Sequence, residues 1–441
     1  MGTTIRRWMI AMIILLVVGG PVFAGGQSEV EKAGSPGKVE MRLAWWGATG
    51  RNEKYLAIID EYQKKNPNVL ITPEYQGWAD YWGKMATMVA ARNLPDVHQY
   101  TNNQLGEFYS KGAVISLEPY IQDGTIKLDD WNMGMVDSGR LDGKLVGVTI
   151  GITAPVMIIN MTWAEELGIE IPPFDASFTW REFADWLKKD VQPKLPAGAY
   201  AFGDYGMAEN YFWTWVRQHN AEWVDANGNY AVPQSVLEGW YGFIDDLRKA
   251  GVAPPLSFTA EDSGKARGDN AFNRRKMLIR PTNANQAKLE QQYMAVEGDR
   301  VEMRRLPMQE GAGSARECLI TSVLSIAANS KVQDEAAKFI NFFVNDKTAQ
   351  SIYNGEIGVP GSYTVQDMLK PNLDFAAAQE FDYINMVSTG SIPTVPKPQG
   401  IWAFDAEIQQ MNQQVAAGNM TPAQAARATI ERANKFLASL K

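Results

Sequence analysis

The chain has 441 residues, of which 45% are hydrophobic and 21% are charged. This is the composition of a globular protein, and the length is enough for two or more hydrophobic cores. The formal net charge is −8, from 42 basic and 50 acidic residues. That balance argues against nucleic acid and anionic lipid as partners.

Residues 1–24 have the order of a secretory signal peptide. Arg6 and Arg7 precede an apolar run, and a small-residue site ends at Ala24, after which we expect cleavage. The apolar run is about 11 residues, short for a membrane span of about 20, so retention as an anchor is the less favoured alternative. Cys318 is the only cysteine, so we expect no disulfide and no lipid attached near the signal. These features predict an exported, periplasmic protein, although a secreted enzyme would share them.

Residues 25–37 are rich in Gly, Ser and charge and predict a disordered spacer, with the ordered chain starting near Lys38. A strand follows, because apolar residues alternate from Val39 to Trp45 and the pattern stops at Gly47. Helical periodicity at 55–62 and 81–89 alternates with apolar strands near 69–71 and 95–97. This βαβαβ alternation is typical of a mostly parallel sheet.

The middle of the chain carries three local signals. Asp142-Gly143 predicts a tight hairpin turn within residues 141–148, and Thr179 with Glu182 predicts a helix start with a capping box. Residues 225–229 resemble a calcium loop, but the required glycine and glutamate are absent, so we expect a hairpin turn there. A buried strand at 156–160 follows the small residues of 151–155, which predicts a crossing between domains.

The remaining elements continue the α/β pattern. Strands are expected at 277–279 and 301–303, on either side of a helix near Leu289. A strongly apolar strand at 318–327 precedes a helix at 336–343, and 358–360 marks another crossing. The last helix is expected to start at Thr421-Pro422.

Several kinds of catalytic motif are absent from the sequence. The two histidines, His98 and His219, have no metal-ligand spacing with each other or with Cys318. There is no G-x-S-x-G elbow and no P-loop, and we expect no cofactor. A glycosidase needs two carboxylates at no fixed spacing, so a secreted carbohydrate-active enzyme stays open as an alternative.

Trp45, Trp46 and Gly47 end the first strand, which is where an α/β sheet opens on its ligand crevice. Indole faces suit the C–H patches of a sugar ring, and indole N–H groups suit its hydroxyls. The triplet therefore indicates an exported protein that holds a sugar. The alternative is that one or both rings pack in the core.

From about Lys38 to Leu440 the chain resembles the extracellular sugar-binding proteins of bacterial ABC importers, of the maltose-binding-protein type. The resemblance rests on seven segments in the family's order, namely WWGATGRNEKYLAIIDEYQKKNP, NLPDVHQY, LDGKLVGVTIGITAPVMIIN, ELGIEIPPFDASFTWREFADWL, DNAFNRRKMLI, AANSKVQDEAAKFINFFVND and GVPGS.

The resemblance implies an α/β, two-lobed periplasmic-binding-protein fold (type II), in which each lobe is a mixed sheet flanked by helices and the ligand cleft lies between the lobes. Residues 38–150 and 317–356 would form the N-terminal lobe, and residues 151–316 and 357–441 the C-terminal lobe. It also implies a monomeric receptor, not an enzyme, whose lobes close on an oligosaccharide and present it to a membrane permease.

The resemblance carries ligand-binding positions onto this sequence. On the N-terminal lobe and the crossing they are Trp45, Trp46, Gly47, Trp78, Tyr81, His98, Tyr100, Asn103, Gln104 and Thr153. On the other lobe they are Glu209, Tyr211, Trp213, Arg280, Thr282 and Trp402. Core packing is the alternative for Tyr81 and Trp213. Maltose receptors carry charged groups where Asn103 and Gln104 stand, which argues against maltose itself.

The class of ligand stays open at this point. The planar guanidinium of Arg280 suits bidentate pairing with a uronic acid. WWG and GWADYWGKMA resemble a subset of these receptors associated with pectin-derived or other plant oligosaccharides. A non-sugar solute such as a glycerol phosphate ester is the alternative within binding proteins.

Overall fold

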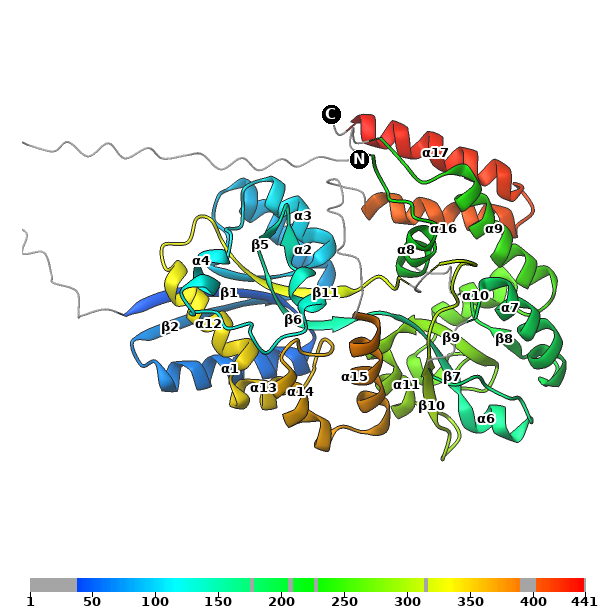
Figure 1. Cartoon of the computed structure of the whole chain (residues 1–441), viewed down its shortest axis with the longest axis horizontal. Helices are drawn as coiled ribbons and strands as arrows, with labels where there is room; N and C mark the ends of the chain where they lie inside the picture. The colour runs from blue at the N-terminus through cyan, green and yellow to red at the C-terminus, as the bar shows by residue number, and fades with distance from the viewer. Residues whose placement is uncertain are drawn as a thin grey trace, which may run out of the picture. The chain divides into compact units, whose positions relative to one another are not determined.

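The computed structural model describes residues 38–174, 178–204, 209–225, 229–312, 316–388 and 402–439 (Figure 1). The side chains at positions 79, 102, 103, 209, 402, 403 and 405 are not described. The signal and spacer predictions lie outside these ranges. No helix within them has both the length and the apolar character needed to cross a bilayer.

The first lobe is built on a five-stranded sheet in the order β2-β1-β3-β11-β6. β1 pairs in parallel with β2 and β3, whereas β11 is antiparallel to β3 and β6. The strands are β1 (Val39–Trp46), β2 (Val69–Gln76), β3 (Val97–Thr101), β6 (Val148–Thr153) and β11 (Ile320–Ile326), with a small hairpin of β4 (Arg140–Leu141) and β5 (Lys144–Leu145). The helices are α1 (Thr49–Lys65), α2 (Trp78–Ala90), α3 (Asn102–Ser110), α4 (Glu118–Gln122), α5 (Met133–Asp137), α12 (Gln333–Asn345) and α13 (Lys347–Tyr353).

The second lobe is built on a four-stranded mixed sheet in the order β10-β7-β9-β8. Its strands are β7 (Pro155–Asn160), β8 (Tyr200–Phe202), β9 (Met277–Asn283) and β10 (Val301–Arg304). Its helices are α6 (Met161–Glu166), α7 (Trp180–Trp186), α8 (Glu209–Gln218), α9 (Gln234–Lys249), α10 (Leu256–Ser263), α11 (Ala287–Gln292), α14 (Tyr363–Leu369), α15 (Phe375–Ser388), α16 (Trp402–Ala416) and α17 (Pro422–Ser439).

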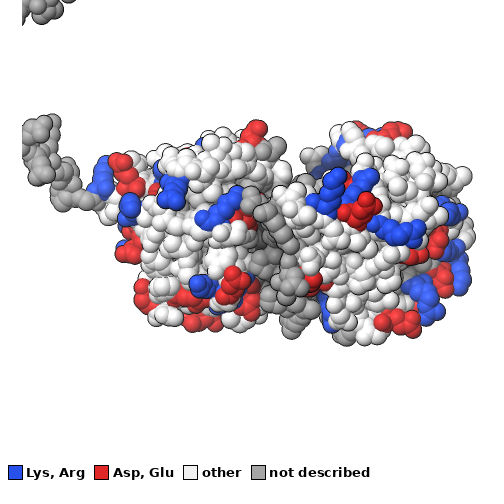
Figure 2. Space-filling model, turned by 90° about the horizontal axis from the view of Figure 1, so that it is seen from above, with Lys and Arg blue, Asp and Glu red and all other residues white. Residues whose placement is uncertain are grey.

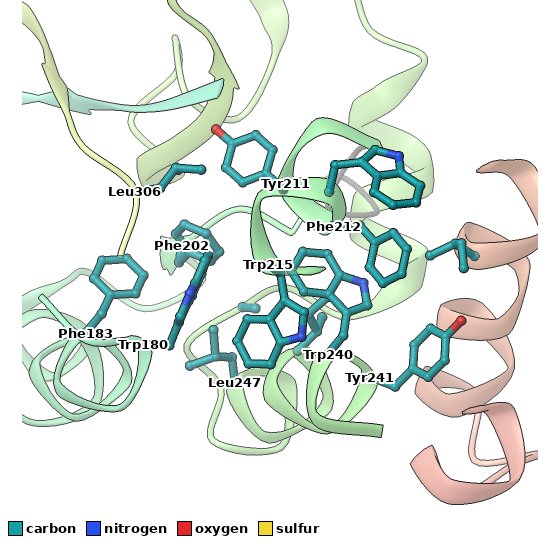
Figure 3. Close-up of a cluster of buried hydrophobic side chains, with 14 of the residues drawn as sticks. Trp180, Phe183, Phe202, Tyr211, Phe212, Trp215, Trp240, Tyr241, Leu247 and Leu306 are labelled. Carbon is teal, nitrogen blue, oxygen red and sulfur yellow. The ribbon is translucent and has the colours of Figure 1, made fainter. Parts of the chain in front are cut away.

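Alternation along the strands divides each lobe into two cores. On β7, Met157 and Ile159 join the core that contains α8, α9, α16 and α17, while Val156 and Ile158 join the core under α15. This follows from the period of two, which sends successive side chains to opposite faces of a sheet. Figure 3 shows the first of these cores, where Trp180, Trp215 and Trp240 pack together.

The chain passes between the two sheets near residue 154. β6 ends at Thr153 in the first sheet and β7 begins at Pro155 in the second. Beside this junction, Ile152 and Val359 exchange two backbone hydrogen bonds of 3.0 and 2.8 Å. The strands of β10 and β11 likewise belong to different sheets. The residue boundaries of the lobes stay a prediction.

The hairpin turn and the capping box expected from the sequence are confirmed. Asp142 and Gly143 both have positive φ, at 48° and 74°, as a two-residue hairpin turn requires. Thr179 and Glu182 form the capping box at the start of α7. Val224 and Tyr230 bridge across the predicted turn, whose residues 226–228 lie outside the described ranges.

Candidate ligand-binding site

The two tryptophans at the end of β1 point to opposite faces of the first sheet. Trp45 has no exposed surface, stacks on Tyr55 with ring centroids 4.5 Å apart, and donates its indole N–H to Asn52 Oδ1 at 2.9 Å. Trp46 belongs to the core on the other face and is 6% exposed. Strand alternation therefore separates the pair, and Trp45 keeps neither a free ring face nor a free N–H in this structure.

An aromatic cluster surrounds Trp46. It consists of Trp46, Trp78, Tyr81 and Trp82. The Trp78 ring meets Trp46 and Trp82 edge-to-face, with centroids 5.2 and 5.3 Å apart. Tyr81 is 2% exposed and donates its hydroxyl to the Gln99 carbonyl at 2.9 Å, so it is a core residue. Burial raises the pKa of this hydroxyl well above its ordinary value.

Trp78 is the exposed member of the aromatic cluster, with 50% of its surface accessible. It is the first residue of α2, two positions after β2 ends at Gln76. Gln76 pairs in register with Trp46, so Trp78 follows the carboxyl edge of two parallel strands. Ligands of α/β sheets bind at such an edge. Trp78 therefore combines the position and the exposure that a ligand-stacking ring needs.

Gly47 has a structural reason to be glycine. Its N–H donates to the Gln76 carbonyl at 3.0 Å, and a Cβ at this position would lie 3.0 Å from Arg51 Cβ and from Asn52 Oδ1. Arg51 in turn donates to the Trp46 carbonyl at 3.2 Å. The close approach of β1 and α1 accounts for this glycine, and its predicted contact with a ligand stays a prediction.

The β3 candidates lie in the interior. His98 and Tyr100 are both 0% exposed and their rings meet edge-to-face. His98 Nδ1 lies 3.0 Å from the Pro95 carbonyl, which makes Nδ1 the protonated nitrogen. Burial lowers the pKa of His98 to about 4, so the ring is neutral at pH 7. The ligand role of His98 and Tyr100 stays a prediction, because neither side chain has exposed surface in this structure.

Gln104 is 9% exposed and accepts a short hydrogen bond from the Thr101 hydroxyl. Asn103 begins α3 with Asn102, and its side chain lies outside the described residues. Asp96 is structural, because its carboxylate accepts from the Arg42 N–H at 2.8 Å and from the Ser330 hydroxyl at 2.7 Å.

Three of the candidates, Thr153, Tyr211 and Thr282, lie beside the start of β7. Thr153 accepts from the Asn285 N–H at 3.1 Å. The Tyr211 hydroxyl accepts from the Thr282 N–H at 2.6 Å and donates to the Val156 carbonyl, and in Figure 3 it points away from the tryptophan core. Tyr211 is therefore a buried link between α8, β7 and β9.

Trp213 packs in the core against Trp223, with ring centroids 3.7 Å apart, and is 5% exposed. Trp215 is equally buried, at 6%. Both indoles therefore pack the lobe, which is the core-packing alternative that the sequence left open for Trp213. The side chains of Glu209 and Trp402, which begin α8 and α16, lie outside the described residues.

Arg280 on β9 is held by a buried carboxylate. Its Nη1 lies 3.0 Å from Glu290 Oε1, and the Glu290 side chain is fully buried. Arg267 binds the same oxygen, while Asn273 donates to Glu290 Oε2 at 2.9 Å. Two guanidinium groups on one carboxylate leave a local excess of one positive charge. Both arginines remain partly exposed, at 20% and 33%.

Sequence reasoning missed two residues of this region. Tyr75 on β2 is 42% exposed and stacks on Trp45 with centroids 5.0 Å apart. Alternation along β2 places Tyr75 on the same face as the buried Val69 and Ile71, so the sequence pattern gave no signal that this ring is exposed. Glu290, which positions Arg280, has no sequence signal, because its two arginines are 23 and 10 residues away along the chain.

The charge distribution shows no single-sign field on the face in Figure 2, where basic and acidic side chains lie side by side over the described surface. Within the described ranges, no group of three or more His, Cys, Asp or Glu side chains is arranged to hold a metal ion. Two features remain as candidates for ligand contact. One is the exposed ring of Trp78 on the first lobe, and the other is the pair Arg267 and Arg280, held by Glu290, on the second.

Comparison with known proteins identifies the family. A family model described as bacterial extracellular solute-binding protein matches residues 48–350, more than half of the chain. The chain therefore belongs to the family of bacterial extracellular solute-binding proteins, which is a family of substrate-binding proteins. A binding protein of Brucella abortus (strain 2308) is 25% identical over 362 residues, covering 77% of this chain and 80% of the relative.

Solved structures show the same fold. An extracellular solute-binding protein of family 1 from Alicyclobacillus acidocaldarius is 24% identical, with a TM-score of 0.74 over 91% of this chain and 99% of its own. A periplasmic oligogalacturonide-binding protein from Yersinia enterocolitica, in complex with saturated digalacturonic acid, is 21% identical, with a TM-score of 0.74 over 91% and 99%. The two-lobed α/β fold expected from the sequence is thus confirmed.

Proposed function

We propose that this protein is the substrate-binding component of an ABC importer and that it binds an oligosaccharide between its two lobes. The observation that carries the proposal is Trp78, a half-exposed indole held edge-on by Trp46 and Trp82 at the carboxyl edge of β1 and β2. A rigid, exposed ring suits the apolar face of a pyranose, because little conformational freedom is lost on stacking.

In the proposed mechanism the sugar contacts both lobes and stabilises a closed form that a membrane permease recognises. A ligand shifts such an equilibrium only by its differential affinity for the two forms. Residues of both lobes must therefore contact the sugar in the closed form. Trp78 and Tyr75 are the exposed rings available on the first lobe, and Arg280 and Arg267 are the partly exposed cations at Glu290 on the second.

We further propose that the ligand is an acidic, plant-derived oligosaccharide. Guanidinium groups pair with carboxylates in a bidentate manner, and the Glu290 network holds two of them in place. The Yersinia protein of the same fold, which binds digalacturonic acid, supports testing this class first. Asn103, Gln104, Glu209, Thr282 and Trp402 keep their predicted ligand roles as part of this proposal.

The proposal includes export. Residues 1–24 would be removed after Ala24, and the mature protein would act in the periplasm as a monomer without a lipid anchor, next to a permease in the membrane. N-terminal sequencing of the protein purified from the periplasm tests the cleavage site. A start at Gly25 is expected, and a start at Met1 would contradict it.

The binding test compares Trp78→Ala with Tyr293→Ala by calorimetric titration against digalacturonate and a neutral maltooligosaccharide. Tyr293 is a matched control because it is 51% exposed and lies at the end of α11. We expect Trp78→Ala to weaken binding about tenfold, since one stacking contact is worth roughly 1.4 kcal/mol, and Tyr293→Ala to leave it unchanged. Hydrolysis of either sugar by the purified protein would contradict the receptor function and favour the enzyme.

A further inference from the structure

The turn between α13 and α14, residues 354–359, forms polar contacts with lysines of both lobes. From α1, Lys54 Nζ lies 2.6 Å from Glu356 Oε2 and donates to the Tyr353 carbonyl at 3.2 Å. From α11, Lys288 Nζ donates to the Gly355 carbonyl at 3.2 Å. The Lys288 bond joins a helix of the second lobe to the turn that follows a first-lobe helix.

The same turn is packed backbone to backbone against the β6–β7 junction. The Val359 N–H donates to the Ile152 carbonyl at 2.8 Å. A Cβ on Gly358, whose φ is +144°, would lie 2.3 Å from the Ile152 oxygen, and a Cβ on Gly151 would lie 2.6 Å from Ile357 Cγ2. The two glycines let the turn and β6 approach closely, so we expect a displacement of the turn to be transmitted to the junction between the two sheets.

A buried carboxyl group lies on the helix beside this turn. Glu380 of α15 is 2% exposed, and its Oε1 has no hydrogen-bond partner among the described residues. Its neighbour Phe381 reaches the turn, where the ring lies 3.8 Å from the place of a Cβ on Gly355. α15 packs against α11, the helix that carries Lys288 (Figure 1). Glu380 therefore lies on a helix that contacts the helix of Lys288, and Lys288 also binds the Gly355 carbonyl.

The charged groups around Glu380 single out Lys288. Burial raises the pKa of Glu380 to about 7, Lys288 opposes this rise, and Asp374 at the start of α15 adds to it. The other charged residues on the packed elements are paired: Glu302 with Arg304 on β10 at 3.0 Å, Glu290 on α11 with Arg267 and Arg280, and Asp382 with Lys370 at 3.4 Å.

We propose that the Gly355 carbonyl and the Glu380 carboxyl group compete for the ammonium group of Lys288, which makes this bond a pH-sensitive strap across the β6–β7 junction. While Glu380 is protonated, Lys288 stays on Gly355 and the strap holds. When Glu380 releases its proton to solvent, a full negative charge in a buried site attracts the ammonium more strongly than a neutral carbonyl does. Lys288 then leaves Gly355, and the turn at residues 354–359 is held less tightly against the β6–β7 junction.

Hydrogen–deuterium exchange tests the strap without any ligand, so its outcome does not depend on the proposed function. The readout is the protection factor of the Ile152 and Val359 amides, corrected for the intrinsic pH dependence of exchange. We expect the protection factor to fall about tenfold from pH 6 to pH 8 in the wild type. This factor corresponds to the lower end of the free energy lost when a hydrogen bond from a charged donor is broken. In Lys288→Met the protection factor should be about tenfold lower at both pH values.

Two variants make the experiment specific. Glu380→Gln keeps the shape of the side chain without its proton equilibrium, so protection should stay high at both pH values. Lys288→Arg keeps a cation on α11 and should retain the pH dependence. A wild type with equal protection at pH 6 and pH 8 would overturn the proposal. So would a Glu380→Gln variant that follows the wild-type profile, or a Lys288→Met variant with wild-type protection.

Discussion

Replacing Glu380 by glutamine is expected to change how stability depends on pH. The buried carboxyl group has a pKa of about 7 in the folded protein, against an ordinary value of 4.5. Burial is the main cause, with Asp374 reinforcing it and Lys288 opposing it. The folded chain therefore holds the proton more tightly than the unfolded chain does.

The sign follows from proton counting. Between pH 4.5 and 7 the unfolded chain has lost this proton while the folded chain keeps it, so the free energy of unfolding falls as pH rises. Below pH 4.5 the contribution is fully present, and above pH 7 the loss is complete. A pKa difference of this size corresponds to about 3 kcal/mol over the whole range. Glutamine has no proton to lose at any of these pH values.

Urea unfolding of both proteins at pH 5, 6, 7 and 8, followed by circular dichroism, measures the effect. We expect the Glu380→Gln variant to gain stability relative to the wild type by about 2.5 kcal/mol between pH 5 and pH 8. Asp382→Asn on the same helix is the control, because its 67% exposed carboxylate forms only a surface pair with Lys370 and should shift the profile little. Parallel profiles for the wild type and Glu380→Gln would refute the reasoning.

Three further predictions concern the turn at residues 354–359 and the candidate site. Gly358→Ala should destabilise the protein by about 3 kcal/mol or more, because its Cβ would collide with the Ile152 carbonyl at a positive φ. Gly50→Ala is the control and should be tolerated, because a Cβ at this position has open space. Thermal melting of the two variants measures the difference. Trp46→Ala should cost about 3–5 kcal/mol as a buried ring, while Trp78→Ala should melt near the wild-type temperature, and equal melting temperatures would contradict the division into buried and exposed rings. Arg280→Gln should weaken binding of digalacturonate about tenfold more than binding of a neutral sugar in calorimetry, and an equal loss for both would remove the carboxylate role.

Elements with strong local patterns could be predicted from the sequence. β1 was expected from its alternation and runs from Val39 to Trp46, and α17 starts at Pro422 after the capping residue Thr421. The capping box at Thr179 and the turn at Asp142-Gly143 depend on contacts within a few residues. Such contacts are fixed by local chemistry, so they can be inferred without knowing the tertiary structure.

The candidate site could be predicted only in part, because exposure is decided by tertiary packing. Trp45 and Trp46 are adjacent in sequence, yet Asn52 and Tyr55 of α1 cover one while Tyr81 and Trp82 of α2 cover the other. Nothing in the local sequence distinguishes Tyr81, which is buried, from Trp78 three residues earlier, which is exposed. The difference arises where α2 packs on β1.

Exposure, and not the indole N–H alone, sets Trp78 apart, because the N–H groups of Trp82 and Trp240 also have no hydrogen-bond partner among the described residues but are buried. Three buried indoles donate to groups of the protein itself: Trp45 to Asn52, Trp180 to Gln218 and Trp215 to the Val236 carbonyl. An indole that already serves the core in this way has no N–H left for a sugar hydroxyl. Among the tryptophans whose side chains are described, Trp78 is the one with an exposed side chain, at 50%, while the others are buried or partly buried. A sugar that stacks on this lobe should therefore change the fluorescence of one ring, and the same ring is the one whose loss the fold can tolerate.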